Sequence, residues 1–138
     1  MEFLRETVEV LGGAAVFRHS INTAQQLDAA ARLGLPTGSI TALGTGFGIQ
    51  PQRILPATTW KRRLKAGRLS PDESDKAVRI AHVLAVARHV LGPAMVPDFL
   101  SAALPELGGS KPADAILSEI GAREVEAILW RIFYGLPA

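Results

Sequence analysis

The sequence predicts an all-α fold. Apolar residues recur every three or four positions along most of the 138 residues, and glycine or proline separates these periodic segments. No segment shows the strict alternation of apolar and polar residues that is typical of a half-buried strand. The length is that of one typical domain or of two small helical subdomains.

Composition excludes several classes of protein. The chain has no cysteine, which rules out a disulfide framework and thiol-ligated zinc and fits a cytoplasmic protein. No segment approaches the roughly 20 consecutive apolar residues of a membrane span. The acidic beginning, MEFLRETVEV, lacks the basic region of a secretory signal. We therefore expect a cytoplasmic protein that makes no membrane contact.

Residues 1–22 predict an N-terminal arm or a short helix. Apolar residues recur at helical spacing from Phe3 to Leu11, and Gly12-Gly13 ends that run. Residues 14–21 show no clear period, so we expect a mobile connection there.

A helical region begins at Thr23. Together with Gln26 it forms a capping-box pattern, which predicts a helix that extends to about Leu33. Gly34 follows as the glycine that typically ends a helix.

Residues 37–49 predict a weaker helix. Ile40, Leu43 and Phe47 are spaced for about three turns, but four glycines each weaken a helix interior by about 1 kcal/mol relative to alanine. We expect this helix to be held mainly by tertiary packing. The GTGFG run has neither the GxGxxG spacing nor a preceding strand, so it does not predict a phosphate-binding loop.

The most basic part of the chain lies within residues 58–74, TTWKRRLKAGRLSPDES. Five cations stand within the eight residues 61–68, with no acid between them. Residues 10–71 as a whole carry eight bases and one acid, whereas the segments on either side are net acidic. A basic middle between acidic ends indicates contact with a polyanion, and nucleic acid is favoured over a merely solvated cationic face.

Helix signals in this stretch predict a helix-turn-helix arrangement. Trp60 and Leu64 are four residues apart, which predicts a face that packs on the protein. Ser70, Pro71 and Glu73 form a capping box that starts the next helix. The short basic helix before this start would then read DNA, as a recognition helix does. The candidate DNA-binding residues are Thr58, Thr59, Lys61, Arg62, Arg63, Lys65 and Arg68.

The C-terminal half predicts further helices. Residues 71–91 form the longest, and its apolar residues lie on more than one face, which is typical of a buried helix. His82 and His89 are two turns apart on it, too far to share one metal ion. The residues expected to point inward are Ile116, Leu117 and Ile120, followed in the last helix by Val125, Ile128, Leu129, Ile132 and Phe133.

Several segments together resemble the Xre/MbcA/ParS antitoxin family, the antitoxins of RES-domain toxins. They are GLP (34–36), TTWKRRLKAGRLSPDES (58–74), AHVLAVARHVLG (81–92), LPELGGSKPADAIL (104–117) and GAREVEAILWRIFYG (121–135). The resemblance covers about residues 23–138. Its most specific parts are RLSPDES, the LGG turn before a proline, and the terminal helix.

The resemblance implies a protein with two functional parts. In the family, an Xre-like helix-turn-helix region represses the operon's own promoter, and a C-terminal domain fills the toxin's NAD-binding cleft with its last residues. RES toxins degrade NAD⁺ or transfer ADP-ribose from it, so the toxin and not this chain would hold a cofactor. We therefore expect residues 23–75 to bind DNA, residues 76–138 to bind toxin, and a homodimer within a larger complex. By this resemblance the toxin-binding residues are Arg123, Glu126, Trp130, Arg131, Tyr134, Gly135, Leu136, Pro137 and Ala138.

Two other functions are the alternatives. A stand-alone transcriptional regulator would need the same basic helix, and its C-terminal domain would only dimerise. An enzyme would need a nucleophile with a base, a carboxylate pair in a cleft, or a metal site. Ser70 and Ser74 are explained by the helix start, and the histidines show no ligand spacing with acids. We therefore expect no catalytic residue, no metal site and no cofactor.

Overall fold

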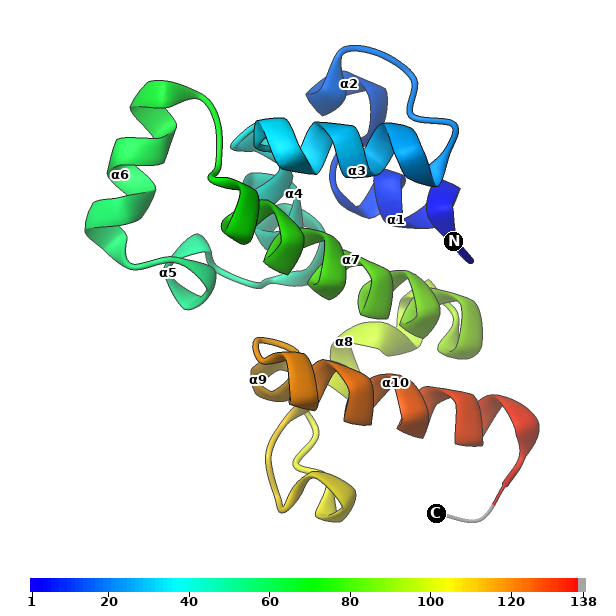
Figure 1. The fold of residues 1–138 in the computed structure, drawn as a ribbon. Helices are drawn as coiled ribbons and strands as arrows, with labels where there is room; N and C mark the ends of the chain where they lie inside the picture. Colours follow the sequence, from blue (N-terminus) through cyan, green and yellow to red (C-terminus); the bar gives the residue numbers. More distant parts are fainter. Residues whose placement is uncertain (137–138) are drawn as a thin grey trace. The chain divides into compact units, whose positions relative to one another are not determined.

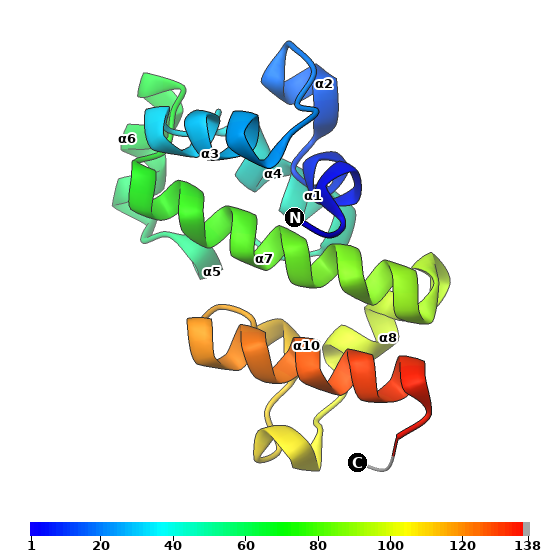
Figure 2. The ribbon, with the colours of Figure 1, turned by 45° about the vertical axis from the view of Figure 1, so that its right-hand side comes forward.

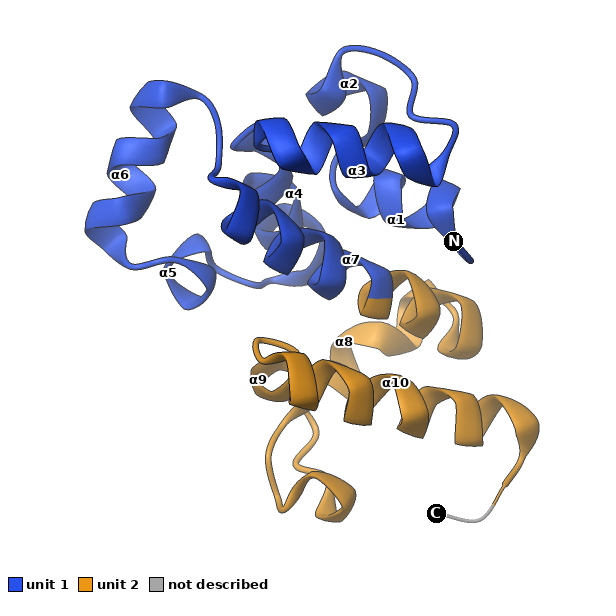
Figure 3. Cartoon of the chain, in the orientation of Figure 1, with its two compact units in different colours: residues 1–82 blue, residues 83–138 orange. Residues whose placement is uncertain are grey.

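The structure is a computed structural model that describes residues 1–136 (Figure 1). Within that range the chain forms ten α-helices and two short 3-10 helices, and no strand, so the all-α prediction is confirmed. The chain divides into two compact units, residues 1–82 and residues 83–138 (Figure 3). The division falls inside the long helix α7 (Pro71–Leu91), which therefore contributes to both units.

Unit 1 is built from six helices and the first part of α7. The helices are α1 (Leu4–Val10), α2 (Gly13–Phe17), α3 (Ala24–Leu33), α4 (Gly38–Phe47), α5 (Pro51–Ile54) and α6 (Ala57–Ala66). In both views α3 lies beside the first turns of α7 (Figures 1 and 2). The fully buried side chains of this unit include Leu11, Leu35, Ile40, Leu43 and Ile80.

The N-terminal segment is packed into unit 1. Val10 and Leu11 are 3 % and 0 % exposed, at the end of the expected short helix. Where the sequence predicted a mobile connection, the chain instead forms α2, and Phe17 at its end is buried. With five residues, α2 is too short to show a helical period in the sequence. Gly12 precedes it with a φ of 109°, a conformation that glycine adopts readily.

Helix α4 forms despite its glycines because tertiary packing supports it, as predicted. Ile40 and Leu43 have no exposed surface. At Gly38 a Cβ atom would stand 3.2 Å from both methyl carbons of Val16, so a larger residue there would crowd α2. The glycine that weakens the isolated helix therefore allows the close approach of two elements.

Unit 2 contains the rest of α7 and a set of shorter elements before one long helix. These are η1 (Pro93–Met95), α8 (Val96–Ser101), η2 (Pro105–Leu107), α9 (Pro112–Ala115) and α10 (Glu119–Tyr134). The Oγ of Ser118 caps α10 by accepting from the backbone N–H of Gly121 at 3.0 Å. Gly121 also lies so close to α9 that a Cβ atom would collide with the carbonyl oxygen of Ala115. The core of this unit includes Leu84, Val86, Ile116, Val125 and Leu129.

Four residues that were predicted to point inward are exposed. Leu64 is 49 % exposed and Ile120 is 72 % exposed, and Ile132 and Phe133 are each 48 % exposed. Burial in α10 ends after Leu129, although the apolar stripe continues for another turn. Helical periodicity predicts which side of a helix is apolar, but it does not predict how far along that side a neighbouring element extends.

Candidate functional site

The basic helix predicted from the sequence is α6, which lies at the edge of unit 1 (Figure 1). Thr58, Lys61, Arg62 and Lys65 are exposed, and their i, i+3, i+4, i+7 spacing places them along one face, here named the α6 stripe. None of its three cations forms an ion pair with another described residue. Trp60 is buried and holds the other side of the helix on unit 1. The α6 stripe therefore offers several donors to an anionic surface.

Arg63, also on α6, is bound to Glu73 near the start of α7. Its Nε donates to Oε1 of Glu73 at 2.7 Å, and its Nη2 donates to Oε2 at 3.2 Å. Burial acts to raise the pKa of the Glu73 carboxyl, but the hydrogen bonds from Arg63 and Ser70 and the charge of Arg63 outweigh burial and lower this pKa. The same hydrogen bond to Glu73 raises the pKa of the Arg63 guanidinium. The carboxylate and the guanidinium thus stabilise each other's charged form.

The two remaining candidate DNA-binding residues lie outside the α6 stripe. Thr59 is half-buried on α6. Arg68 is exposed but follows the end of the helix, and its Nη1 donates to the carbonyl oxygen of Gly34 at 3.3 Å. The structure thus places four of the seven candidates on one exposed face and directs Thr59, Arg63 and Arg68 elsewhere.

Hydrogen bonds at the start of α7 connect it with the exit of α6 and with the segment that follows α3. The predicted capping box is present, because Ser70 Oγ accepts from the N–H of Glu73 at 3.2 Å and Glu73 Oε1 accepts from the N–H of Ser70 at 2.8 Å. Ser74 is fully buried, and its Oγ accepts from the N–H of Leu35 at 2.8 Å and donates to the carbonyl of Ser70 at 2.8 Å. The N–H of Leu69 also donates to the carbonyl of Leu35 at 2.9 Å. These bonds hold the exit of α6 against the segment that follows α3.

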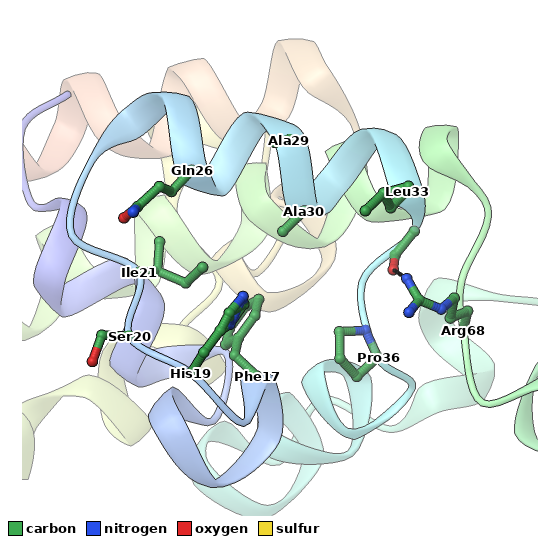
Figure 4. Close-up of a pocket in the computed structure, with 11 residues that line it drawn as sticks. Phe17, His19, Ser20, Ile21, Gln26, Ala29, Ala30, Leu33, Pro36 and Arg68 are labelled. Atoms are coloured by element: carbon green, nitrogen blue, oxygen red, sulfur yellow. Dashed lines mark hydrogen bonds between the residues drawn. The ribbon is translucent and has the colours of Figure 1, made fainter.

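A cavity of about 410 Å³ lies near this junction (Figure 4). Its lining includes the side chains of Phe17, Ile21 and Pro36, with Gln26 and Arg68 at its margin. Since most of these side chains are apolar and Arg68 is engaged with the backbone, we assign no ligand to this cavity.

The last turns of α10 carry an aromatic cluster. The ring centroids of Trp130 and Phe133 are 5.5 Å apart at 89°, and those of Phe133 and Tyr134 are 5.1 Å apart at 86°. His89 of α7 lies against this group, with its ring 5.5 Å from that of Phe133. Edge-to-face packing of this kind orders aromatic rings. Tyr134 is nevertheless 66 % exposed and Phe133 48 % exposed. We call Trp130, Ile132, Phe133, Tyr134 and Leu136 the α10 surface.

Three charged candidates for toxin binding lie along α10. Arg123 is exposed and pairs with Glu119 one turn earlier. Glu126 is half-buried and accepts from Nε1 of Trp130 at 3.3 Å. Arg131 is half-buried. These residues lie on α10 with the aromatic cluster, and Glu126 contacts it directly.

The end of α10 has a defined turn. Gly135 adopts a φ of 66°, and its N–H donates to the carbonyl of Ile132 at 3.1 Å. The N–H of Leu136 donates to the carbonyl of Arg131 at 2.9 Å, which completes a Schellman motif. Leu136 is 58 % exposed. Pro137 and Ala138, the last two candidates, lie outside the described residues.

Residues 1–136 contain neither a cluster of metal ligands nor a single membrane-spanning helix. No group of three or more His, Cys, Asp or Glu side chains there could hold a metal ion. No single helix in the same range is long and apolar enough to cross a membrane, and only Pro71–Leu91 together with Pro93–Ser101, a pair bent by 114°, has the length and apolar composition of a span.

Some residues of these sites were not identified from the sequence. Glu73 and Ser74 were assigned only to the helix start, because their further partners Arg63 and Leu35 are 10 and 39 positions away. Phe133 has the character of an anchor for a cleft, but it fits the inward stripe, which favours the core. The signal that could have placed it at a surface is the gathering of three of the chain's eight aromatic residues within residues 130–134.

Both parts of the chain match known protein families. Residues 26–82 match the antitoxin Xre-like helix-turn-helix domain, and residues 86–135 match the antitoxin Xre/MbcA/ParS C-terminal toxin-binding domain. A curated relative, described as antitoxin Xre from Pseudomonas putida strain KT2440, is 31 % identical over 98 residues. That alignment covers 70 % of this chain and 62 % of the relative. The first matched region contains α6, and the second contains most of the α10 surface.

Proposed function

Because the chain belongs to the Xre/MbcA/ParS antitoxin family, we propose that it neutralises a RES-domain toxin that acts on NAD⁺ and represses its own operon promoter. The observation that carries this proposal is the exposure of Ile132, Phe133 and Tyr134 on α10, within the region that matches a toxin-binding domain. Contiguous exposed apolar side chains are uncommon on a protein with no partner and typically mark an interface. In this proposal the chain acts by binding and not as an enzyme.

The chemistry of the α10 surface suits insertion into a cleft. Aromatic side chains contribute much of the binding energy of interfaces, since they bury a large area with few rotatable bonds. Tyr134 adds a hydroxyl group to the apolar area of Phe133 and Leu136. We propose that these side chains and the residues after Gly135 occlude the NAD-binding cleft of the toxin. Arg123, Glu126, Trp130, Arg131, Pro137 and Ala138 complete the proposed toxin-binding set.

A truncated chain tests this role. A chain that ends after Trp130 should still bind DNA but should not restore growth or cellular NAD⁺ when the toxin is co-expressed. Within the full chain, Tyr134→Ala should weaken toxin binding by at least about 2 kcal/mol, or about 30-fold in Kd, as expected for an aromatic hot spot. Ile120→Ala is the matched control, because Ile120 is 72 % exposed at the opposite end of α10. Full rescue by the truncated chain would contradict the proposal.

For the DNA side, we propose that the α6 stripe contacts phosphates and base edges of the operator. Arg62→Ala should weaken binding and should reduce the slope of log K against log salt by about 0.9 for each phosphate that the variant no longer neutralises. Lys111→Ala removes an exposed cation from unit 2 and should change neither quantity. An unchanged affinity in a folded Arg62→Ala variant would exclude this face of α6 from the DNA interface.

We also propose that the chain is a homodimer within a larger complex, since helix-turn-helix proteins commonly read two half-sites with two copies. Light scattering of the chain alone and mixed with toxin measures both masses. A monomer under both conditions would contradict the dimer. A chain that binds DNA but neither binds nor neutralises a RES-domain toxin would instead be a stand-alone regulator.

A further inference from the structure

We propose that Arg63 is a positioning residue that sets the orientation of α6 on DNA by binding Glu73, and that it does not itself contact a phosphate. This inference rests on the proposed DNA binding by α6. It divides the cations of the basic helix into two roles: the α6 stripe touches DNA, and Arg63 holds the stripe in place.

The direction of Arg63 separates it from the α6 stripe. At 100° per residue, Arg63 is about 60° from the buried Trp60 and about 150° from the centre of the stripe. Its side chain is 25 % exposed, whereas Lys61, Arg62 and Lys65 all stand in the exposed class. Arg63 and Trp60 thus form the inner side of α6.

The bond between Arg63 and Glu73 has the geometry of a clamp. Two nitrogen atoms of Arg63 reach two oxygen atoms of Glu73, at 2.7 Å and 3.2 Å, and the Glu73 side chain is only 15 % exposed. Paired bonds of this kind restrict orientation as well as distance. The same Oε1 of Glu73 accepts from the N–H of Ser70, so Arg63 is tied to the capping box of α7. This clamp therefore fixes the orientation of α6 relative to the first turn of α7.

The link from α6 to α7 is short, and backbone bonds hold it to the segment after α3: the N–H of Thr37 donates to the carbonyl of Gly67 at 3.1 Å, and the N–H of Leu69 donates to the carbonyl of Leu35 at 2.9 Å. Gly67 ends α6 with a φ of 79°, and a Cβ atom built there meets nothing within 4 Å. These bonds hold the chain after α6, whereas within the helix itself Trp60 is the buried residue that anchors the inner side. Arg63 supplies a second anchor nearly one turn later and so sets which side chains face outward.

Charge also argues against binding of Arg63 to a phosphate. The guanidinium of Arg63 is already paired with the Glu73 carboxylate. Moving it to a phosphate would leave that carboxylate partly buried and unpaired close to a polyanion. We therefore expect Arg63 to add nothing to the counterion release that α6 produces on binding DNA.

Salt-dependent DNA binding by variants of the full chain tests the proposal. Arg63→Ala should lower affinity at least about fivefold at every salt concentration, because only a fraction of the free molecules then holds the stripe in the binding orientation, while the bound molecules keep every stripe contact. Its log–log salt slope should equal that of the native chain, whereas Arg62→Ala should reduce the slope by about 0.9. If Arg63→Ala reduced the salt slope as much as Arg62→Ala does, the positioning role would be overturned.

Glu73→Gln distinguishes a positioning role of Arg63 from a phosphate contact, because the two roles predict opposite changes in DNA affinity. Glutamine can keep the capping-box acceptor while it removes the charge that holds Arg63. A positioning clamp predicts weaker DNA binding, and the double variant with Arg63→Ala should be no weaker than the weaker single variant. A phosphate contact restrained by Glu73 predicts the reverse, since the freed Arg63 would tighten binding and steepen the salt slope.

Arg63→Lys supplies the conservative comparison. Lysine keeps the charge of arginine but lacks its planar guanidinium. The DNA affinity of Arg63→Lys should therefore be closer to that of Arg63→Ala than to that of the native chain. Recovery of native affinity would favour a simple charge contact and would overturn the clamp. Toxin neutralisation should be retained by all of these variants and checks that they fold.

The outcomes also separate the clamp from the proposed DNA function. If neither the native chain nor Arg62→Ala shows salt-dependent operator binding, the proposed DNA function fails. If Arg62→Ala reduces the salt slope as expected and Arg63→Ala reduces it too, the clamp alone is refuted.

Discussion

Replacing Ser74 by alanine removes one fully buried oxygen atom from unit 1. The Ser74 hydroxyl is fully buried, accepts from the N–H of Leu35 and donates to the carbonyl of Ser70. Leu35 is itself 0 % exposed. In Ser74→Ala the N–H of Leu35 would therefore have no acceptor at a site that water does not reach.

The size of the effect follows from that missing acceptor. A buried donor left without a partner costs about 1–3 kcal/mol, more than the net gain from an ordinary hydrogen bond, because its desolvation is no longer offset. With a urea m-value of about 2 kcal/mol per molar, the unfolding midpoint of unit 1 should fall by about 0.5–1.5 M.

Urea unfolding followed by circular dichroism measures this difference. Ser101→Ala is the matched control, because its hydroxyl also donates to the carbonyl four residues earlier, at 3.0 Å, but is exposed. The control should change the unfolding free energy by less than about 0.5 kcal/mol. A Ser74→Ala variant as stable as Ser101→Ala would refute the argument that this hydroxyl holds the segment after α3 against α7.

Three further changes test other parts of the structure. Gly121→Ala should destabilise unit 2 by about 1–3 kcal/mol in urea unfolding, because its methyl group would collide with the carbonyl of Ala115. Gly46→Ala, where a Cβ atom meets nothing within 4 Å, should instead stabilise α4 by about 0.5–1 kcal/mol, and a loss of stability there would contradict the open space. The lowered pKa of Glu73 means that its ionised form contributes stability that is complete above its ordinary value of 4.5 and is lost as pH falls through the lower folded-state pKa. Unfolding free energy measured against pH should therefore fall more steeply below pH 4.5 in the native chain than in Glu73→Gln, and parallel curves would show that the bond to Arg63 does not perturb this carboxyl.

Helix ends are the part of this fold that could be predicted most directly. The capping boxes at Thr23 and Ser70 both form as their sequence patterns indicated. A capping box involves residues only three positions apart, so the local sequence contains both partners. Helix α2 could not be predicted in the same way, because five residues hold too little of a period and the helix depends on its packing in unit 1.

The candidate sites also combine features that the local sequence predicts with features that depend on residues far away in the chain. The density of cations identified α6, but it could not separate Arg62 from Arg63, which are adjacent in the chain. The structure separates them because Glu73, ten residues after Arg63, binds one and leaves the other exposed. In α10 the apolar period continues through Phe133, and only the position where neighbouring elements end shows that its ring is half exposed.

The sequence by itself determined the all-α class, the positions of the main helices, the basic helix and the family, because each depends on short-range periodicity, capping patterns or motifs. Only the tertiary structure decided which side chains of those helices are available to a partner. Availability depends on contacts between residues far apart in the chain, such as Ser74 with Leu35, and on where each apolar face stops being covered. That is the physical reason why Arg63 changes from a candidate DNA contact to a proposed clamp, and Phe133 from a core residue to part of a proposed interface.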